Sequence, residues 1–410
     1  MDVRAAGGSP NNFAKLTPIS IIHCKYMAQE LKFKGTALFT GRQLLPGSMV
    51  LITTNSGKVL DIVHESSAGE DVRLLNGIIT PGFVNTHCHL ELSHMKGVIP
   101  EGTGLPAFLT SVMEKRGQQD HAAQQEAISR ADVAMWESGI SAVGDICNGT
   151  ATLAQKQHTK LYYHSFIESM GFIPAAAQSR YDYSMDILHQ FRTLNSPMHT
   201  CSVVPHAPYS VSSELFALLA GTPDNTPVSI HNQECEAENT LYQDKTGAFL
   251  DFYAHFGMDA SAFTPPGTNS LPAWLPWFKH LPVILVHNTY STASDIAFTK
   301  EQAPKAWWCL CPQANLYIEK RLPDVALLRS HASAITLGTD SLASNHSLSV
   351  WQEIQAIRKQ FPEISLEEIL QWATLNGAEA LGITHTYGGF EKDKQPGITL
   401  ISETESRRIL

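Results

Sequence analysis

Eight short β-type runs recur along the central part of the chain, and helix-like segments lie between them. Several of the runs are nearly continuous in Val, Ile and Leu, as expected for parallel strands that are buried on both faces. The segments between them, such as 127–139 and 349–361, carry apolar residues at helical spacing and often end near Gly. The eight predicted strands are 82–89, 141–146, 161–168, 200–207, 227–234, 282–289, 307–313 and 333–340.

The number and order of these units predict the fold class. Eight strand-then-helix units in about 300 residues favour an α/β protein built as a (β/α)8 TIM barrel. A doubly wound dinucleotide-binding sheet is disfavoured, because no G-x-G-x-x-G follows a strand. We therefore predict a barrel over residues 79–384.

Both ends of the chain differ from the central part. The segment before about residue 80 is turn-rich and β-like, and the tail after 385 also alternates strands and turns. We predict that 20–78 and 385–410 pair into one small composite β-domain beside the barrel.

Composition narrows the choice of partners. The 410 residues are 43% apolar and carry 29 basic against 39 acidic side chains, a net charge of −10. This charge argues against binding to nucleic acid or to an anionic membrane. The chain has no apolar run near the ~18–20 residues that span a bilayer, and its start, 1–13, does not resemble a secretory signal. Seven scattered cysteines without C-x-x-C spacing fit a reducing compartment. We expect a cytoplasmic protein that acts on a small molecule.

Histidines and carboxylates gather at the ends of the predicted strands, where a barrel places its active site. His87 and His89 are two residues apart, so on a strand both imidazoles face the barrel interior while Cys88 points away. Three imidazoles and one carboxylate match the ligand set of a divalent catalytic metal that keeps one position for water. Such a metal lowers the pKa of its bound water toward ~7. The alternative is a polar layer inside the barrel. The other strand-end residues are His206, His231, Glu234, His287 and Asp340.

Glu234 follows His231 by three residues, in the stretch HNQE. A buried carboxyl in this loop is suited to shuttle a proton from water to a leaving group. The alternative is an acid at a helix N-terminus, favoured by the helix dipole. The neighbouring Glu236 and Glu238 are expected to be solvated. By chemistry alone, His206 and His231 are interchangeable as the third metal ligand.

Three further residues are candidates for substrate contact. Glu91 continues the inward alternation after His89, and Glu168 ends the third predicted strand. Asn345 lies in the loop after the eighth strand. Together with His346, it is also suited to position this loop. The alternatives are a structural loop acid for Glu91 and helix capping in the last loop.

Five stretches together resemble the amidohydrolase superfamily, in its mononuclear deaminase and chlorohydrolase branch. They are TPGFVNTHCHLE (80–91), PHAPYSVS (205–212), IHNQE (230–234), VHN (286–288) and LGTDSLASN (337–345). The similarity covers about residues 77–385. Within the branch, HCHLELSHMKG and PHAPYSVS are most similar to aminodeoxyfutalosine deaminases and S-adenosylhomocysteine deaminase-like proteins.

The resemblance implies a role for each strand-end residue. His87, His89, His231 and Asp340 would bind one Zn²⁺ or Fe²⁺, with Zn²⁺ preferred. Glu234 would be the proton shuttle, His287 would orient or deprotonate the water, and Asp340 would also accept a hydrogen bond from the attacking hydroxide. His206 would bind substrate. The binuclear branches bridge two metals with a lysine or glutamate on the fourth strand, and 200–207 contains neither.

The leading functional prediction is a hydrolytic deaminase that releases ammonia from an amino-substituted N-heterocycle of the adenine type. One alternative keeps the site but expels chloride from a triazine-like ring or cleaves a cyclic amide. Another is a catalytically silent barrel that binds a small molecule. The loops 90–118 and 169–185 are expected to set the substrate, and a homodimer is the family-level expectation.

Overall fold

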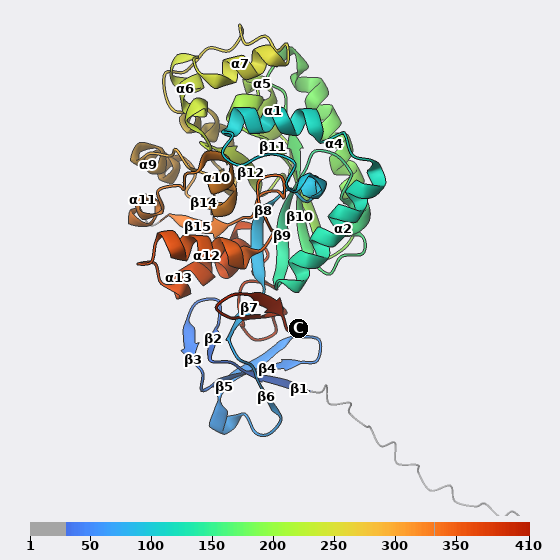
Figure 1. Cartoon of the computed structure of the whole chain (residues 1–410), viewed down its shortest axis with the longest axis vertical. Coiled ribbons are helices and arrows are strands. Elements are labelled where there is room, and N and C mark those ends of the chain that lie inside the picture. Colours follow the sequence, from blue (N-terminus) through green and yellow to red (C-terminus); the bar gives the residue numbers. More distant parts are fainter. Residues whose placement is uncertain (1–29, 332) are drawn as a thin grey trace, which may run out of the picture.

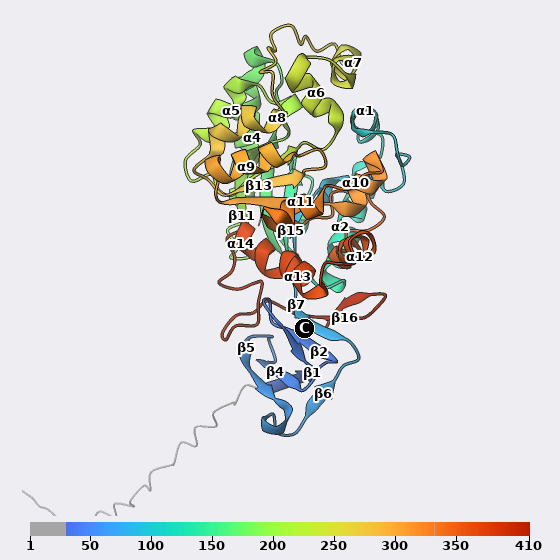
Figure 2. The same ribbon diagram turned by 90° about the vertical axis from the view of Figure 1, so that its left-hand side faces the viewer.

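The computed structural model describes residues 30–331 and 333–410, shown in two perpendicular views in Figures 1 and 2. The predicted start of the β-domain at 20–29, the N-terminal stretch 1–13 and Cys24 lie outside the described residues. The other six cysteines are free. Within the described ranges, no helix is both long and apolar enough to cross a bilayer.

The eight predicted central strands are confirmed, and they form two parallel four-stranded sheets. The orders are β11-β10-β9-β8 and β12-β13-β14-β15. Every residue of β8, β9, β10, β12 and β13 is buried, as expected for strands covered on both faces. The strands are β8 (Phe83–Cys88), β9 (Ile140–Cys147), β10 (Tyr162–Ser169), β11 (His199–Pro205), β12 (Val228–Asn232), β13 (Val283–His287), β14 (Ala306–Leu310) and β15 (Ala334–Leu337).

Backbone hydrogen bonds connect the two sheets at both of their shared edges. On one side, the N–H groups of Thr339 and Asp340 donate to the carbonyl of His87, at 2.9 and 3.1 Å, and a parallel bridge joins Cys88 to Asp340. On the other side, the N–H of His231 donates to the carbonyl of His206 at 2.9 Å. The ends of β8, β11, β12 and β15 are thereby brought together.

Helices surround the two sheets (Figure 1), and their apolar faces explain this placement. In α12, for example, Val350, Trp351, Ile354 and Ile357 are buried, as the helical spacing predicts. The longer helices are α1 (Leu105–Lys115), α2 (His121–Glu137), α4 (Ala177–Arg192), α5 (Ser213–Ala220), α6 (Glu236–Asp244), α7 (Ala248–His255), α9 (Ala293–Gln302), α10 (Pro312–Glu319) and α12 (Val350–Gln360). The shorter ones are α3 (Leu153–Lys156), α8 (Ser270–Trp274), α11 (Val325–Ser330), α13 (Leu366–Gln371) and α14 (Gly377–Ala380).

The last helical segment, 366–380, is not one regular helix. A π-helical turn at Trp372–Asn376 separates α13 from α14. Gly377 follows this turn and packs so closely on β8 that an added Cβ would lie 2.8 Å from the Cβ of Val84. The glycine therefore permits the close approach of helix and strand.

The two ends of the chain contribute to a pair of smaller sheets below the helices in Figure 1. One has the order β5-β4-β1-β6, and the other has the order β17-β16-β7-β2-β3, which mixes N- and C-terminal strands. Phe33, Leu51, Ile79 and Ile398 belong to their shared core. The strands are β1 (Glu30–Lys34), β2 (Ala37–Phe39), β3 (Leu44–Pro46), β4 (Met49–Thr54), β5 (Val59–His64), β6 (Val72–Leu74), β7 (Ile78–Pro81), β16 (Ile398–Ile401) and β17 (Ser406–Arg408).

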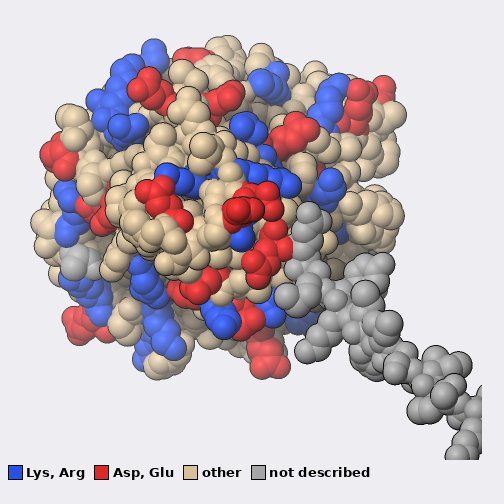
Figure 3. All heavy atoms as spheres, turned by 90° about the horizontal axis from the view of Figure 1, so that it is seen from below, with Lys and Arg blue, Asp and Glu red and all other residues tan. Residues whose placement is uncertain are grey.

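Basic and acidic side chains are interspersed on the face seen from below (Figure 3). Exposed ion pairs in the loops beside the smaller sheets include Lys58–Asp393 at 2.8 Å and Arg42–Glu391 at 3.9 Å.

Candidate metal centre and substrate cavity

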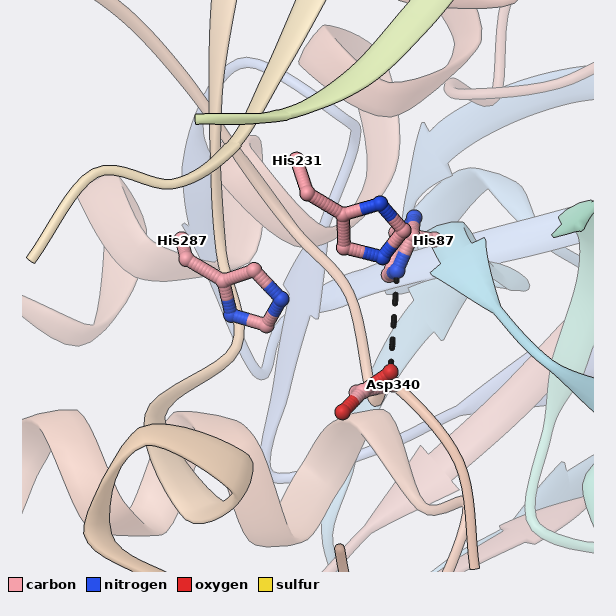
Figure 4. A group of neighbouring side chains, drawn as sticks. All are labelled: His87, His231, His287 and Asp340. Atoms are coloured by element: carbon pink, nitrogen blue, oxygen red, sulfur yellow. Dashed lines mark ion pairs between the residues drawn. The ribbon is translucent and has the colours of Figure 1, made fainter. Parts of the chain in front are cut away.

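Four side chains from different strands converge where the central strands end. His87 comes from β8, His231 from β12, His287 from β13, and Asp340 follows β15. One nitrogen or oxygen atom from each lies within 4.8 Å of the others, and all four residues are buried. Figure 4 shows the three imidazoles and the carboxylate gathered around a common point.

His89 completes this cluster from the end of β8. Its Nε2 lies 3.1 Å from Nε2 of His87, 3.2 Å from Nε2 of His231 and 3.3 Å from Oδ1 of Asp340. Ligand atoms on a tetrahedral ion with bonds of ~2.1 Å are separated by roughly 3.4 Å. Three imidazoles and one carboxylate at these separations are a donor set that fits a divalent cation.

Hydrogen bonds orient two members of the cluster. Nδ1 of His231 lies 2.9 Å from the carbonyl of His206. Because a carbonyl only accepts, Nδ1 carries the proton and Nε2 presents its lone pair to the cluster. Ser344 Oγ donates to Oδ2 of Asp340 at 2.5 Å, which leaves Oδ1 facing the histidines.

The protonation states also suit a cation. Burial lowers the pKa of His89 and of His231 to about 4, so both imidazoles are neutral near pH 7. Burial opposes ionisation of Asp340, but the nearby imidazoles of His87, His89 and His287 hold the pKa of its carboxyl well below its usual range. Neutral imidazoles and an ionised carboxylate are the forms that bind metal.

Left-handed backbone conformations occur at two of the site residues and at their neighbours in the chain. Gln233, His287, Asn288 and Asp340 have φ values of 46°, 74°, 62° and 56°, which are uncommon for residues other than glycine. They turn the chain sharply where the strands end. Strain of this kind gathers at functional sites and persists only where surrounding contacts hold it.

Glu238 is one of these contacts, and the expectation that it is solvated is wrong. It is 0% exposed, and its Oε1 accepts hydrogen bonds from the Gln233 N–H at 2.9 Å and from Ser270 Oγ at 2.5 Å. The side chain lies in the first turn of α6 and faces the loop that carries Glu234. Glu236, two residues earlier, is exposed as expected.

Glu234 and His287 form a buried pair beside the cluster. Glu234 Oε1 lies 3.5 Å from Nε2 of His287. Burial, with the nearby Asp340 adding to it, raises the pKa of the Glu234 carboxyl well above its usual range. Asn315 Nδ2 donates to Nδ1 of His287 at 3.2 Å, so the ring's proton lies on Nε2, toward Glu234. Asn315 follows β14 near the end of a predicted strand, but an asparagine there carries no chemical signature that sequence analysis recognises.

A cavity of about 400 Å³ opens onto these groups. Of the predicted site residues, His89, Glu91, Glu168, His206, His231, Glu234, His287 and Asp340 line it. His87 lies beneath them and is fully buried. The remaining wall is largely apolar and includes Leu105, Phe108, Leu109 and Val112 of α1, Phe172 and Ile173, and Phe252, Tyr253 and Met258 from α7 and the loop after it.

Asn345 is placed differently from the expectation that it contacts substrate. It is not among the described residues that line the cavity. Its Nδ2 donates to the carbonyl of Thr339 and to Oε1 of Glu353, both at 2.8 Å, and its Oδ1 accepts from the Ser347 N–H. These bonds use its polar atoms to hold the loop after β15. Asn345 therefore positions the loop after β15 and does not line the cavity in which a substrate would bind.

Asn148 is a cavity residue that sequence analysis missed. Its N–H donates to Glu91 Oε2 at 3.0 Å, and its Nδ2 donates to Glu168 Oε2 at 2.9 Å. Burial raises the pKa of Glu91 to about 7 and that of Glu168 to about 8. Asn148 directly follows β9, so the same attention to strand ends would have found it.

A second group of possible ligand atoms comprises Glu168, His206 and His231. His231 Nδ1, which lies 3.5 Å from Glu168 Oε1, already donates its proton to a carbonyl. That nitrogen has no free lone pair, and Nε2 of the same ring belongs to the first cluster. This group therefore fits hydrogen bonding better than a second cation.

Comparisons with known proteins identify the family of the chain. The sequence profile of the amidohydrolase family matches residues 78–408. An adenosine deaminase of Helicobacter pylori is 26% identical over 347 residues, which cover 80% of each chain. An aminodeoxyfutalosine deaminase of a Nitratiruptor species is 28% identical over 317 residues, 75% of each chain.

The fold is also similar to a solved structure. The crystal structure of Helicobacter pylori aminofutalosine deaminase in complex with methylthio-coformycin superposes with a TM-score of 0.79 and 22% identity. The match covers 92% of this chain and 93% of that one. The chain described here is therefore an α/β protein that shares this fold.

Proposed function

Because the chain belongs to the amidohydrolase family, we propose that it is a metal-dependent hydrolytic deaminase that releases ammonia from an adenine-type nucleoside. The observation that carries this proposal is the buried Glu234 beside a His/Asp cluster on the floor of one cavity. The names of the similar proteins, which include adenosine and aminodeoxyfutalosine deaminases, support the substrate class.

The proposal includes the fold that presents the site. The two parallel sheets would close into one (β/α)8 barrel over 79–384, since hydrogen bonds connect them at both edges. The described part of 20–78 and the segment 385–410 would form the small composite β-domain, because β7 pairs with both β2 and β16. The cytoplasmic location and the homodimer stay predictions.

We assign the ligand set of one divalent cation to His87, His89, His231 and Asp340. Zn²⁺ is the proposed ion, and Fe²⁺ suits the same donors. A cation bound there would lower the pKa of a water molecule and so supply the nucleophile at neutral pH. Because the pKa of Glu234 is raised and that of Asp340 is low, Glu234 is the carboxyl group that can donate a proton and Asp340 is the one that can accept a proton.

In this division, Asp340 accepts a proton from the attacking water because its carboxylate is ionised. Glu234 donates its proton to the ring nitrogen, and the remaining hydroxyl proton of the water then passes through Glu234 to the leaving amine. The proton held by Asp340 returns to Glu234, so both carboxyl groups regain their starting states. His287, whose Nε2 proton faces Glu234, orients the water between them. The carbon–oxygen bond forms, the carbon–nitrogen bond breaks, and the products are ammonia and the oxo-substituted ring.

Substrate binding is assigned to His206, Glu91 and Glu168, which line the cavity above the cluster. Nδ1 of His206 lies 2.6 Å from Ser210 Oγ, which fixes the ring and leaves Nε2 available to a ligand. The apolar wall between α1 and α7 would enclose the less polar part of the substrate.

The test is ammonia release from a panel of adenosine, 5′-deoxyadenosine, methylthioadenosine, guanine and cytosine by Zn²⁺-loaded protein. We expect turnover of at least one adenine nucleoside. Chloride release from a chlorotriazine without any ammonia release would favour the chlorohydrolase alternative. Inactivity on every substrate, with well under one tightly bound metal per chain, would favour the silent barrel and contradict the proposal.

A further inference from the structure

Two histidines of the cluster have opposite hydrogen-bond partners at Nδ1. His231 Nδ1 lies 2.9 Å from the carbonyl of His206, which can only accept a hydrogen bond. His287 Nδ1 lies 3.2 Å from the amide nitrogen of Asn315, which can only donate one. A neutral imidazole carries a single proton. That proton is therefore on Nδ1 in His231 and on Nε2 in His287.

Distance alone does not separate the roles of these two rings. His287 is one of four residues whose possible ligand atoms lie within 4.8 Å of one another. Figure 4 shows the ring nitrogen remote from its main chain pointing toward the other three side chains. Histidines that bind a metal usually donate the proton of their second nitrogen to a carbonyl or a carboxylate. His231 follows this pattern and His287 departs from it, so the partner at Nδ1 distinguishes them.

Hydrogen bonds fix the amide group of Asn315. The residue lies in α10 and is 1% exposed. Its Nδ2 also donates to Thr289 Oγ1 at 2.9 Å, so one amide holds both ends of the turn 287–289, which begins with two left-handed residues. The first turn of α10 is held in turn by Glu353, whose Oε2 accepts from the Gln313 N–H at 2.9 Å. The donor at His287 Nδ1 is thus set by the fold.

We propose that Asn315 is a positioning residue that keeps His287 out of the metal's ligand set and makes it a hydrogen-bond donor. Its amide holds the imidazole as the Nε2–H tautomer, and a ring nitrogen that carries a proton has no lone pair for a cation. The inference rests on the proposed function and deepens it, because it explains how one of the clustered imidazoles is reserved for orienting the water.

Two substitutions at this position separate the inference from a role in packing. Asn315→Asp has nearly the shape of the wild type but places a carboxylate acceptor at Nδ1, so the proton should move to Nδ1 and free Nε2. Asn315→Leu offers neither donor nor acceptor, so both tautomers should be populated. Turnover should therefore decrease from the wild type to the leucine variant and again to the aspartate variant. Packing alone predicts the opposite order for the two variants.

The first measurement is nitrogen NMR of Zn²⁺-loaded protein labelled at histidine, in which the chemical shifts report the nitrogen that carries the proton. The His287→Gln variant identifies the signals of this ring. We expect the proton on Nε2 in the wild type, on Nδ1 in Asn315→Asp, and on both nitrogens in Asn315→Leu. If the amide of Asn315 is turned over, its oxygen accepts from Nδ1–H. A wild-type proton on Nδ1 would therefore overturn the inference.

The second measurement is the visible absorption of Co²⁺-loaded protein, which depends on the number and type of ligands. Asn315→Asp should change the spectrum, because Nε2 of His287 becomes available as a ligand. Adding His287→Gln to this variant should restore the wild-type spectrum. Asn376→Asp is the matched control, since Asn376 Nδ2 donates to the main chain of β15 at Ile335 rather than to a histidine. It should leave the tautomer and the spectrum unchanged.

Steady-state kinetics give the size of the effect. The wrong tautomer of a catalytic histidine costs up to about 10⁴-fold in a serine protease. We expect Asn315→Asp to lower kcat about 10²-fold or more with little change in KM. Asn315→Leu should lower kcat about tenfold, as for the loss of one hydrogen bond.

This inference and the proposed function can fail separately, because neither spectrum requires turnover. If the tautomer and the Co²⁺ spectrum change as expected but no nucleoside releases ammonia, only the deaminase is contradicted. If ammonia is released while both Asn315 variants keep the wild-type tautomer, only the inference is contradicted. Should the aspartate variant not fold, the leucine variant decides, and an unchanged tautomer in it would overturn the role of Asn315.

Discussion

Replacing Glu234 with glutamine tests the proton shuttle, which is the central step of the proposed reaction. The substitution keeps the shape of the side chain but removes its acidic proton. Glu234 is 3% exposed, and its Oε1 lies 3.5 Å from His287 Nε2. The adjacent Asp340 cannot replace it as the acid, because its pKa is held well below the usual range.

The expected loss follows from this isolation. Positioned general acid–base groups contribute about 10²–10⁴-fold. Because Asp340 is ionised and cannot donate in its place, we expect Glu234→Gln to lower kcat about 10³-fold, or ~4 kcal/mol in the barrier. Because the shuttle acts in the transition state, kcat and kcat/KM should fall together while KM changes little.

The assay is steady-state ammonia release from the best nucleoside of the panel, with bound metal measured on the same preparation. Glu236→Gln is the matched control, since Glu236 is two residues away but exposed, and it should retain wild-type turnover. A Glu234→Gln variant that keeps its metal and loses less than about tenfold in kcat would refute the assignment of Glu234 as proton donor.

Three further predictions concern stability. Glu238→Ala should lower the free energy of unfolding by about 1–3 kcal/mol in urea titrations, because it leaves a buried N–H of the loop unpaired; an unchanged midpoint would contradict its role in holding the loop. His89 and His231 have folded-state pKa values of about 4, so in metal-free protein the contribution of each to the free energy of unfolding is lost as the pH drops from about 6.5 to about 4. Over this range the Tm of the wild type should therefore fall relative to that of a His89→Gln variant; a constant difference between the two calorimetric Tm values would argue against it. Gly377→Ala should lower the free energy of unfolding by about 1–3 kcal/mol, and with it the Tm, because the added Cβ would lie 2.8 Å from the side chain of Val84 in β8. Gly117→Ala is the control: the added carbon meets open space, so the Tm should change little.

The sequence by itself determined the local elements and most of the chemistry. Strand positions could be predicted because residues buried on both faces of a parallel sheet must be apolar over their whole length. Alternation along a strand then placed His87 and His89 on one face. The resemblance to a known family, rather than spacing, distinguished the proposed ligand His231 from His206.

Only the tertiary structure decided how the loops after the strands direct their side chains. Glu238 reads as a surface acid, yet the first turn of α6 directs it inward to a main-chain N–H. Asn345 turns away from the cavity, toward Thr339 and Glu353. Asn148 joins two acids from separate strands. Such contacts join residues far apart in the chain, through left-handed turns that depend on surrounding packing, so no local pattern of hydrophobic and polar residues contains them.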